Sequence, residues 1–138
     1  MGAETDIHAA LIGRLETLTT SLPIHYPGVT FDDTSGEYIR ATHLRNDPVR
    51  RTYNGAERFM RMGFLRLDVF RRVDAGTYQV TADAQAEAIA DHFPPDLVLT
   101  SGGETIRVKL TRIETGRKDP NGTHWMTPVV VEYRTSKA

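Results

Sequence analysis

The sequence predicts a single α+β domain over residues 1–138, with a mostly antiparallel sheet of about five strands, two helices packed on one face, and a protruding long β-hairpin. Two segments carry apolar residues at helical spacing. Other segments alternate in polarity and are bounded by turn-forming residues, which is typical of strands. A chain of 138 residues is long enough to bury one core, and without cysteine it forms no disulfide.

The N-terminal segment predicts an amphipathic helix. Asp6 or Thr5 is expected to cap it, and Pro23 is expected to end it. Its apolar residues recur every three or four positions and form one stripe, made of Ile7, Leu11, Leu15, Leu18 and Leu22. Residues 23–37 are rich in proline, glycine and aspartate, so we expect a loop around a short extended piece at Val29–Phe31.

Two strands joined by a basic turn predict the protruding hairpin. The first covers about 37–45, and residues 46–57 are turn-rich, with Asn54-Gly55 as the strongest turn signal. The second strand, residues 58–73, has apolar residues of both parities, so part of it is expected to be covered on both faces. At ~3.3 Å per residue it would reach roughly 50 Å, and a bulge or bend is expected, most favourably at Gly63.

A helix and three strands complete the predicted domain. The helix covers Thr77–His92, with Thr81 or Asp83 as its cap and a stripe of Ala82, Ala86, Ile89 and Phe93. Residues 97–100 and 104–113 form a hairpin, residues 115–122 a loop, and residues 123–134 the last strand. Pro128 lacks a backbone donor, so the last strand is expected to have a free edge there.

Positive charge is concentrated in residues 45–72. That stretch contains eight arginines and three acidic residues, a net charge of +5, whereas the whole chain carries −1. The remaining residues therefore sum to −6, and residues 74–96 contain five acidic residues but no lysine or arginine. A charge division of this kind suits an anionic partner or a complementary copy of the same protein.

The sequence contains no recognisable catalytic, cofactor-binding or metal-binding constellation. Its five histidines are not at metal-ligand spacing, and no nucleophile elbow, phosphate-binding loop or dinucleotide fingerprint occurs. No apolar run approaches the ~20 residues that a membrane span needs. We therefore expect a binding or assembly protein without catalytic, cofactor or metal residues and without a membrane partner.

Five segments in chain order carry a resemblance that spans nearly the whole chain. They are DIHAALIGRLETL, EYIRATHLRND, NGAERFMRMGFLRLDVF, ADAQAEAIADHFPP, and TSGGETIRV followed by HWMTPVVVEYR. In their order, lengths and local pattern they resemble the phage tail terminator proteins, a lambda-like family also found in prophages and gene transfer agents.

The resemblance implies a structural role in the virion and no active site. Members of that family form a six-membered ring at the head-proximal end of the tail tube, after assembly in the bacterial host cytoplasm. The ring stops tube polymerisation and presents the surface that joins tail to head. The implied partners are copies of the same chain, the tail tube protein and a head–tail connector or neck protein, with double-stranded DNA passing transiently through the central hole.

Strand alternation divides the basic residues into a tip group and a long-strand group, and both fit the expected ring. The tip arginines Arg50, Arg51 and Arg58 are expected to face the lumen or DNA. The subunit interface is expected to pair basic residues of the long strand with acidic residues of the second helix: Arg61, Arg66, Arg71 and Arg72 with Asp83, Glu87 and Asp91. Two alternatives remain open, namely another neck component such as a connector or stopper, and a small nucleic-acid-binding module that uses the arginine-rich hairpin.

Overall fold

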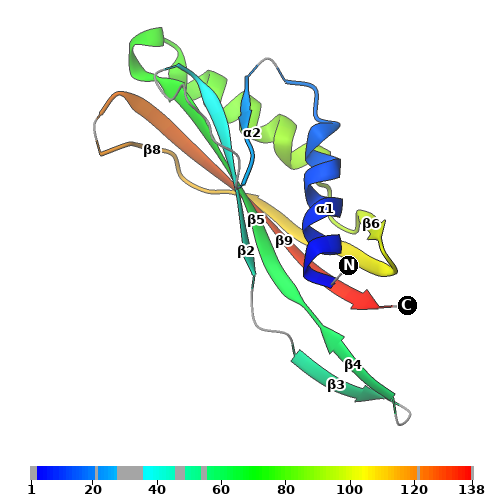
Figure 1. Ribbon diagram of the computed structural model, residues 1–138. Helices are drawn as coiled ribbons and strands as arrows, with labels where there is room; N and C mark the ends of the chain where they lie inside the picture. The colour runs from blue at the N-terminus through cyan, green and yellow to red at the C-terminus, as the bar shows by residue number, and fades with distance from the viewer. Residues whose placement is uncertain are drawn as a thin grey trace.

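The computed structural model describes residues 3–20, 22–27, 36–45, 49–53, 56–120 and 122–137, with only the backbone described at 49–60. Its elements, in chain order, are α1 (Ala3–Glu16), β1 (Ile24–His25), β2 (Tyr38–Arg45), β3 (Val49–Tyr53), β4 (Ala56–Met60), β5 (Met62–Arg72), a 3-10 turn (Val73–Ala75), α2 (Tyr78–His92), β6 (Val98–Ser101), β7 (Glu104–Ile113), β8 (Arg117–Lys118) and β9 (His124–Lys137). Figure 1 shows one sheet with both helices on the same side and a two-stranded ribbon projecting from one end.

The predicted α+β class and the mostly antiparallel sheet are confirmed. The sheet order is β1-β2-β5-β9-β7-β6, and β8 also pairs with β9. Only the β1–β2 pair is parallel among the described strands. The described sheet has seven strands, not about five, because the two-residue strands β1 and β8 are too short to produce a sequence pattern. The expected extended piece at Val29–Phe31 lies outside the described residues.

One hydrophobic core holds both helices against the sheet. The predicted helical stripes supply residues that are fully buried, and β5, β7 and β9 supply the facing side chains, among them Leu65, Leu67, Val69, Ile106, Val108, Val129 and Val131. Each large aliphatic side chain buried in this way contributes about 1.5–3 kcal/mol. Apolar burial between the layers therefore fixes both helices on one face.

The ends of α1 differ from the prediction. The helix begins at Ala3, so neither Asp6 nor Thr5 caps it, and it ends at Glu16 instead of reaching Pro23. The Thr17 hydroxyl donates to the Arg14 carbonyl at 2.6 Å and so satisfies one of the free carbonyls at the helix end. Leu22 is still buried, because the chain after the helix packs back onto the core.

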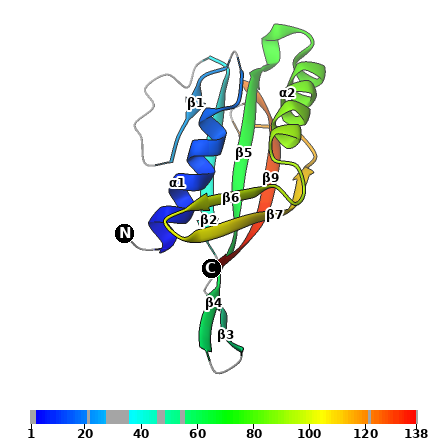
Figure 2. The same ribbon diagram turned by 90° about the vertical axis from the view of Figure 1, so that its right-hand side faces the viewer.

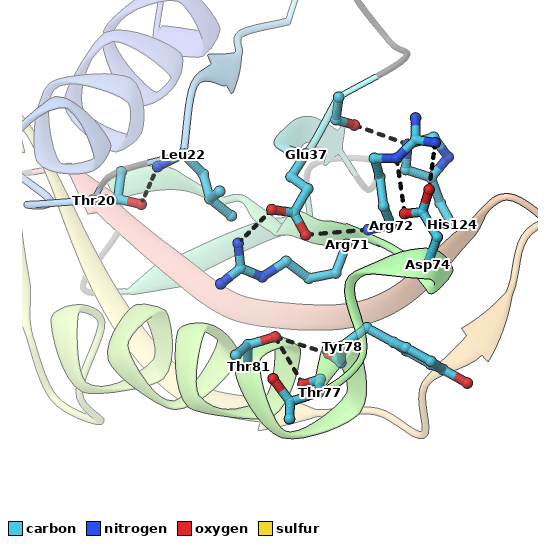
Figure 3. Close-up of polar contacts among 11 residues, drawn as sticks. Thr20, Leu22, Glu37, Arg71, Arg72, Asp74, Thr77, Tyr78, Thr81 and His124 are labelled. Atoms are coloured by element: carbon cyan, nitrogen blue, oxygen red, sulfur yellow. Dashed lines mark hydrogen bonds and ion pairs between the residues drawn. The ribbon is translucent and has the colours of Figure 1, made fainter.

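The start of α2 also differs, although its stripe is confirmed. Thr77 is the residue before the helix and makes no side-chain cap, while Thr81 and Asp83 lie inside the helix. The Thr81 hydroxyl donates back to the carbonyls of Thr77 and Tyr78, at 3.0 and 3.2 Å (Figure 3). A threonine that bonds to the preceding turn cannot at the same time cap a later one.

The protruding hairpin is confirmed, but it is built differently from the prediction. Residues 49–53 form strand β3 instead of a turn, and β3 pairs with β4 alone in a separate ribbon, here called the arm. Asn54 and Gly55 lie outside the described residues. The expected single strand 58–73 is interrupted at Arg61, which separates β4 from β5. At that break, the Thr135 N–H donates to the Arg61 carbonyl at 2.8 Å and ties the base of the arm to β9.

Gly63 has a role other than the expected bend. A Cβ at this position would lie 2.5 Å from the Tyr133 hydroxyl and 2.6 Å from the Leu44 carbonyl oxygen. Glycine therefore allows the closest approach between neighbouring strands at this point. The strand is instead interrupted two residues earlier, at Arg61.

The expected free edge at Pro128 is wrong, since β9 lies in the middle of the sheet between β5 and β7. Pro128 pairs with Asp68 of β5, and its carbonyl accepts from the Glu114 N–H at 2.9 Å on the other side. The N–H and C=O of a strand residue point the same way, so the missing donor faces the gap between the end of β7 and the start of β8. Proline interrupts no β7–β9 pair there, because that pairing ends one residue away, at Ile113 and Val129.

The expected second apolar face of β5 is confirmed. Tyr38, Phe70 and Met126 form a small buried cluster separate from the main core. The rings of Tyr38 and Phe70 stack at 4.6 Å, and the Arg40 guanidinium lies 5.0 Å from the Phe70 ring. Alternate residues of one strand therefore enter two different apolar clusters.

Candidate assembly surfaces

The basic stretch of residues 45–72 extends along the whole molecule and does not form one patch. Figure 2 shows β5 running from the arm, at one end of the subunit, to the neighbourhood of α2 at the other. Arg61 is therefore at the base of the arm, Arg66 in the middle of the sheet, and Arg71 and Arg72 at the far end. Each position has different neighbours and has to be considered separately.

Arg66 belongs to a three-residue ion-pair cluster on the sheet. Its Nε lies 2.9 Å from Asp68 Oδ1, and Arg40 Nη2 lies 3.2 Å from Asp68 Oδ2. The Asp68 side chain is only 1% exposed, so its carboxylate would be costly to bury without these two partners. Arg66 thus already compensates a buried charge of its own subunit.

Arg71 and Arg72 are also held by carboxylates of the same chain, as Figure 3 shows. Arg71 pairs with Glu37 at 3.1 Å, and the second oxygen of Glu37 accepts the backbone N–H of Arg72. The Arg72 guanidinium binds both oxygens of Asp74, at 2.9 and 3.1 Å. This pairing raises the pKa of Arg72 and lowers that of Asp74. These arginines join β5 to the segments before β2 and after β5.

The tip arginines lie on the arm. Arg50 and Arg51 are on β3 and Arg58 is on β4, and only their backbone is described. Arg51 and Arg58 are direct cross-strand partners in the register of the ribbon. Like charges at such a pair of positions destabilise a hairpin. The register therefore places two positive charges opposite each other on a ribbon whose two strands pair only with each other among the described residues.

The predicted acidic residues form one line along α2. Asp83, Glu87 and Asp91 are spaced by four residues, and all three are exposed. Within the described part of the chain, none of them has an ion-pair partner. Like charges at this spacing cost a helix about 0.2–0.5 kcal/mol per pair. The subunit leaves that cost uncompensated among its described residues.

Figures 1 and 2 place α2 and the arm at opposite ends of the subunit. The structure thus brings Arg66, Arg71 and Arg72 together with acids other than those on α2, and it keeps the arm arginines away from α2. Any contact between the arm and α2 would have to form between two copies. Arg66 and Arg72 pair with acids two positions along the chain, at the spacing that puts strand residues on one face. Residue spacing does not encode the pairing of Arg71 with Glu37, which strand register brings together.

Sequence reasoning missed a histidine cluster between α1 and the sheet. His8 Nδ1 lies 3.0 Å from His43 Nδ1, and a hydrogen bond links His43 Nε2 to the Tyr133 hydroxyl. Burial, followed by the nearby His8 and Arg45, lowers the pKa of His43 to about 4. The two histidines are 35 positions apart, so no local motif could have indicated them.

The described residues contain no group of three or more histidine, aspartate or glutamate side chains arranged to hold a metal ion. Among the same residues, no helix is long and apolar enough to cross a membrane.

Two oppositely charged surfaces that cannot meet within one subunit are typical of a protein that associates with other chains. The family comparison agrees: a model of the phage tail terminator proteins matches residues 6–133, so the chain belongs to that family. It is accordingly a structural component of the virion tail and not an enzyme.

Solved structures share the fold over nearly the full chain. One superimposes with a TM-score of 0.77 at 23% sequence identity and covers 98% of this chain and 96% of that chain. Another, from the virion of a native gene transfer agent particle, superimposes with a TM-score of 0.62 at 17% identity and covers 98% of both chains. No curated protein matches the sequence.

Proposed function

We propose that this chain forms a six-membered ring that caps the head-proximal end of the tail tube, stops tube polymerisation and provides the surface for joining the head. Membership of the tail terminator family supports this role. The observation that carries it is the separation of a basic arm from an acidic helix at opposite ends of one subunit. Such a pair makes a head-to-tail contact, which closes into a ring when the rotation between subunits allows it.

The partners in this proposal are neighbouring copies, the tail tube protein and a head–tail connector or neck protein, with DNA passing through the ring. Asp83, Glu87 and Asp91 are the proposed acidic contacts between subunits. Arg66, Arg71 and Arg72 would have to exchange or share their own carboxylates to reach a neighbour, whereas the arm arginines lie beyond the sheet. Arg61, at the base of the arm, belongs to the same proposed interface.

Tail length in particles tests the proposal. Removing the gene should give tails of uncontrolled length that do not join heads, and electron microscopy measures both effects. Tails of normal length without the protein would exclude a terminator and would favour the alternative of another neck component. Native mass spectrometry of the purified chain, alone and with tail tube protein, should detect six copies. A strict monomer under both conditions would contradict the ring.

The three arginines of the arm favour nucleic-acid binding as the second candidate function. In that case, affinity for DNA would fall steeply with salt, by roughly one unit of logarithmic slope per phosphate contact. A fluorescence anisotropy titration at several salt concentrations measures that slope. Absence of binding at low salt would eliminate this candidate and leave the ring unaffected.

A further inference from the structure

A groove lies between α2 and the segment that connects β7 to β8. Its volume is about 450 Å³, within the range of ligand-binding clefts. Gln79, Asp83 and Glu87, spaced by four residues along one side of α2, form one wall. Residues 113–116 form the opposite wall, and Trp125 of β9 lies between the two. The groove thus combines carboxylates with an aromatic side chain.

The carboxylates on the helix wall have no cation partner among the described residues. Asp83 and Glu87 make no ion pair within the described residues, and they repel each other at helical spacing. On the opposite wall, Glu114 has a loose contact with Arg112, with 3.9 Å between Nε and Oε2. A cation in the groove would relieve the repulsion and meet carboxylates on both walls.

The aromatic side chain is held rigidly. The Trp125 indole N–H donates to the Thr127 hydroxyl at 3.1 Å, and the Tyr78 ring lies 5.7 Å away. Gly116 approaches so closely that a Cβ there would lie 2.5 Å from the indole nitrogen. Ile113, 41% exposed, adds apolar surface to the wall. A fixed, half-buried indole beside unpaired carboxylates is suited to a guanidinium, which stacks on aromatic rings and binds carboxylates with two hydrogen bonds.

The arm is rich in arginines and poor in acidic residues. Residues 49–60 contain three arginines and one glutamate, and Arg51 faces Arg58 across the ribbon. A two-stranded ribbon on its own is at best marginally stable in water. The arm and the groove lie at opposite ends of one subunit, so they can meet only between two copies (Figure 2).

We propose that this groove receives arginines from the arm of a second copy of this chain. The contact rests on the proposed ring and specifies its interface: the neighbour's Arg50, Arg51 or Arg58 lies over Trp125 and between the carboxylates of the two walls. The like charges on the arm and on α2 are then neutralised by each other. A chain with only the arm or only the groove cannot contact both of its neighbours, so it cannot continue the ring.

A matched pair of charge reversals tests the groove. Glu87→Arg should weaken association between subunits about thirtyfold or more, because it places like charges in the contact. Glu16→Arg is the control, since Glu16 is also an exposed helical glutamate and the change in net charge is identical. Native mass spectrometry over a concentration series measures association, and thermal unfolding checks that both variants fold. Equal weakening of both variants would overturn the groove contact.

Cross-linking tests the occupant directly. The natural chain has no cysteine, so Glu87→Cys combined with Arg51→Cys introduces the only thiols. Oxidation should give covalent oligomers up to the closed ring, whereas Glu16→Cys with Arg51→Cys should give none. If wild-type rings form but the first pair does not cross-link, the arm docks elsewhere and the ring itself stands. If Arg51→Glu leaves rings intact and instead hinders DNA passage, the arm faces the channel. Absence of wild-type rings, alone or on tail tube protein, would reject the proposed function itself.

Discussion

The body and the arm of this subunit are stabilised by different means. In the body, two helices cover one face of a seven-stranded sheet, and most core side chains are fully buried. The arm is a two-stranded ribbon of five residue pairs outside the sheet. Apolar burial therefore stabilises the body, whereas a two-stranded ribbon such as the arm is only marginally stable on its own. Changes in the body should accordingly affect folding, and changes in the arm should affect assembly.

The largest effect on stability is expected in the core. Leu67 of β5 is fully buried between the sheet and the helices, so Leu67→Ala should lower the free energy of unfolding by about 2–5 kcal/mol. Urea denaturation followed by circular dichroism measures the change. Val80→Ala is the control, because Val80 is 71% exposed and its loss should cost little. Similar losses for both variants would mean that the body is not organised around this core.

A smaller loss is expected at the junction of body and arm. In Gly63→Ala the new Cβ would collide with the Tyr133 hydroxyl and with the Leu44 carbonyl, and the backbone atom cannot move aside cheaply. We expect a cost of about 1–3 kcal/mol in urea denaturation. Gly13→Ala is the matched control in α1, where nothing lies near the added Cβ, and it should stabilise by roughly 0.5–1 kcal/mol. Equal effects would show that Gly63 does not mark a close contact.

These two glycines also show what the sequence could and could not predict. The helical stripes were predictable because burial on one face imposes a period on the apolar residues, and both stripes are buried. The role of Gly63 could not be predicted, because its neighbours come from β2 and β9, which lie far from it along the chain. The prediction of a free edge at Pro128 was wrong for the same reason. Which strand ends opposite Pro128 depends on tertiary structure and not on the local sequence. The helix ends could not be predicted either. They depend on local hydrogen bonds that several threonines and aspartates could make equally well.

Among the charged residues, too, some placements could be predicted from the sequence and others could not. The spacing of Asp83, Glu87 and Asp91 predicts that they lie on one line of a helix, and the structure places them in α2 with exposed side chains. The Arg71–Glu37 pair could not be predicted, because strand register brings residues 34 positions apart together. Arg66 and Arg72 pair with Asp68 and Asp74 two positions along the chain, a local spacing that the sequence contains.

Lowering the pH should reduce the folding stability of the body, through the histidine contact between α1 and the sheet. The pKa of His43 is lowered from its ordinary 6.5 to about 4, mainly by burial, with His8 and Arg45 adding to the effect. The unfolded chain therefore takes up a proton at a higher pH than the folded protein does. The stabilisation is complete above about pH 6.5 and is lost as the pH falls towards 4.

Because His43 is partly exposed to solvent, we expect a loss of only about 1 kcal/mol from this source. Urea denaturation at pH 7 and pH 5 measures it, with His43→Gln as the comparison. The variant should lose less stability between the two pH values than the natural chain. An identical pH dependence in both proteins would show that His43 does not control the response.

The smallest effect on folding, and the largest on assembly, is expected from excising the arm. Replacing residues 46–62 with Asn-Gly would close the hairpin at the Arg45–Gly63 pair with a two-residue turn suited to antiparallel strands. Among the residues whose side chains are described, every member of the buried core lies outside the arm, so the free energy of unfolding of the monomer should change by less than about 1 kcal/mol. Ring formation should be abolished, because the groove on α2 then has no occupant. Arg51→Glu keeps the arm at full length and should weaken the ring without removing it. An arm-less chain that unfolds at much lower urea would show that the ribbon stabilises its own body, and the contrast between the two regions would then fail.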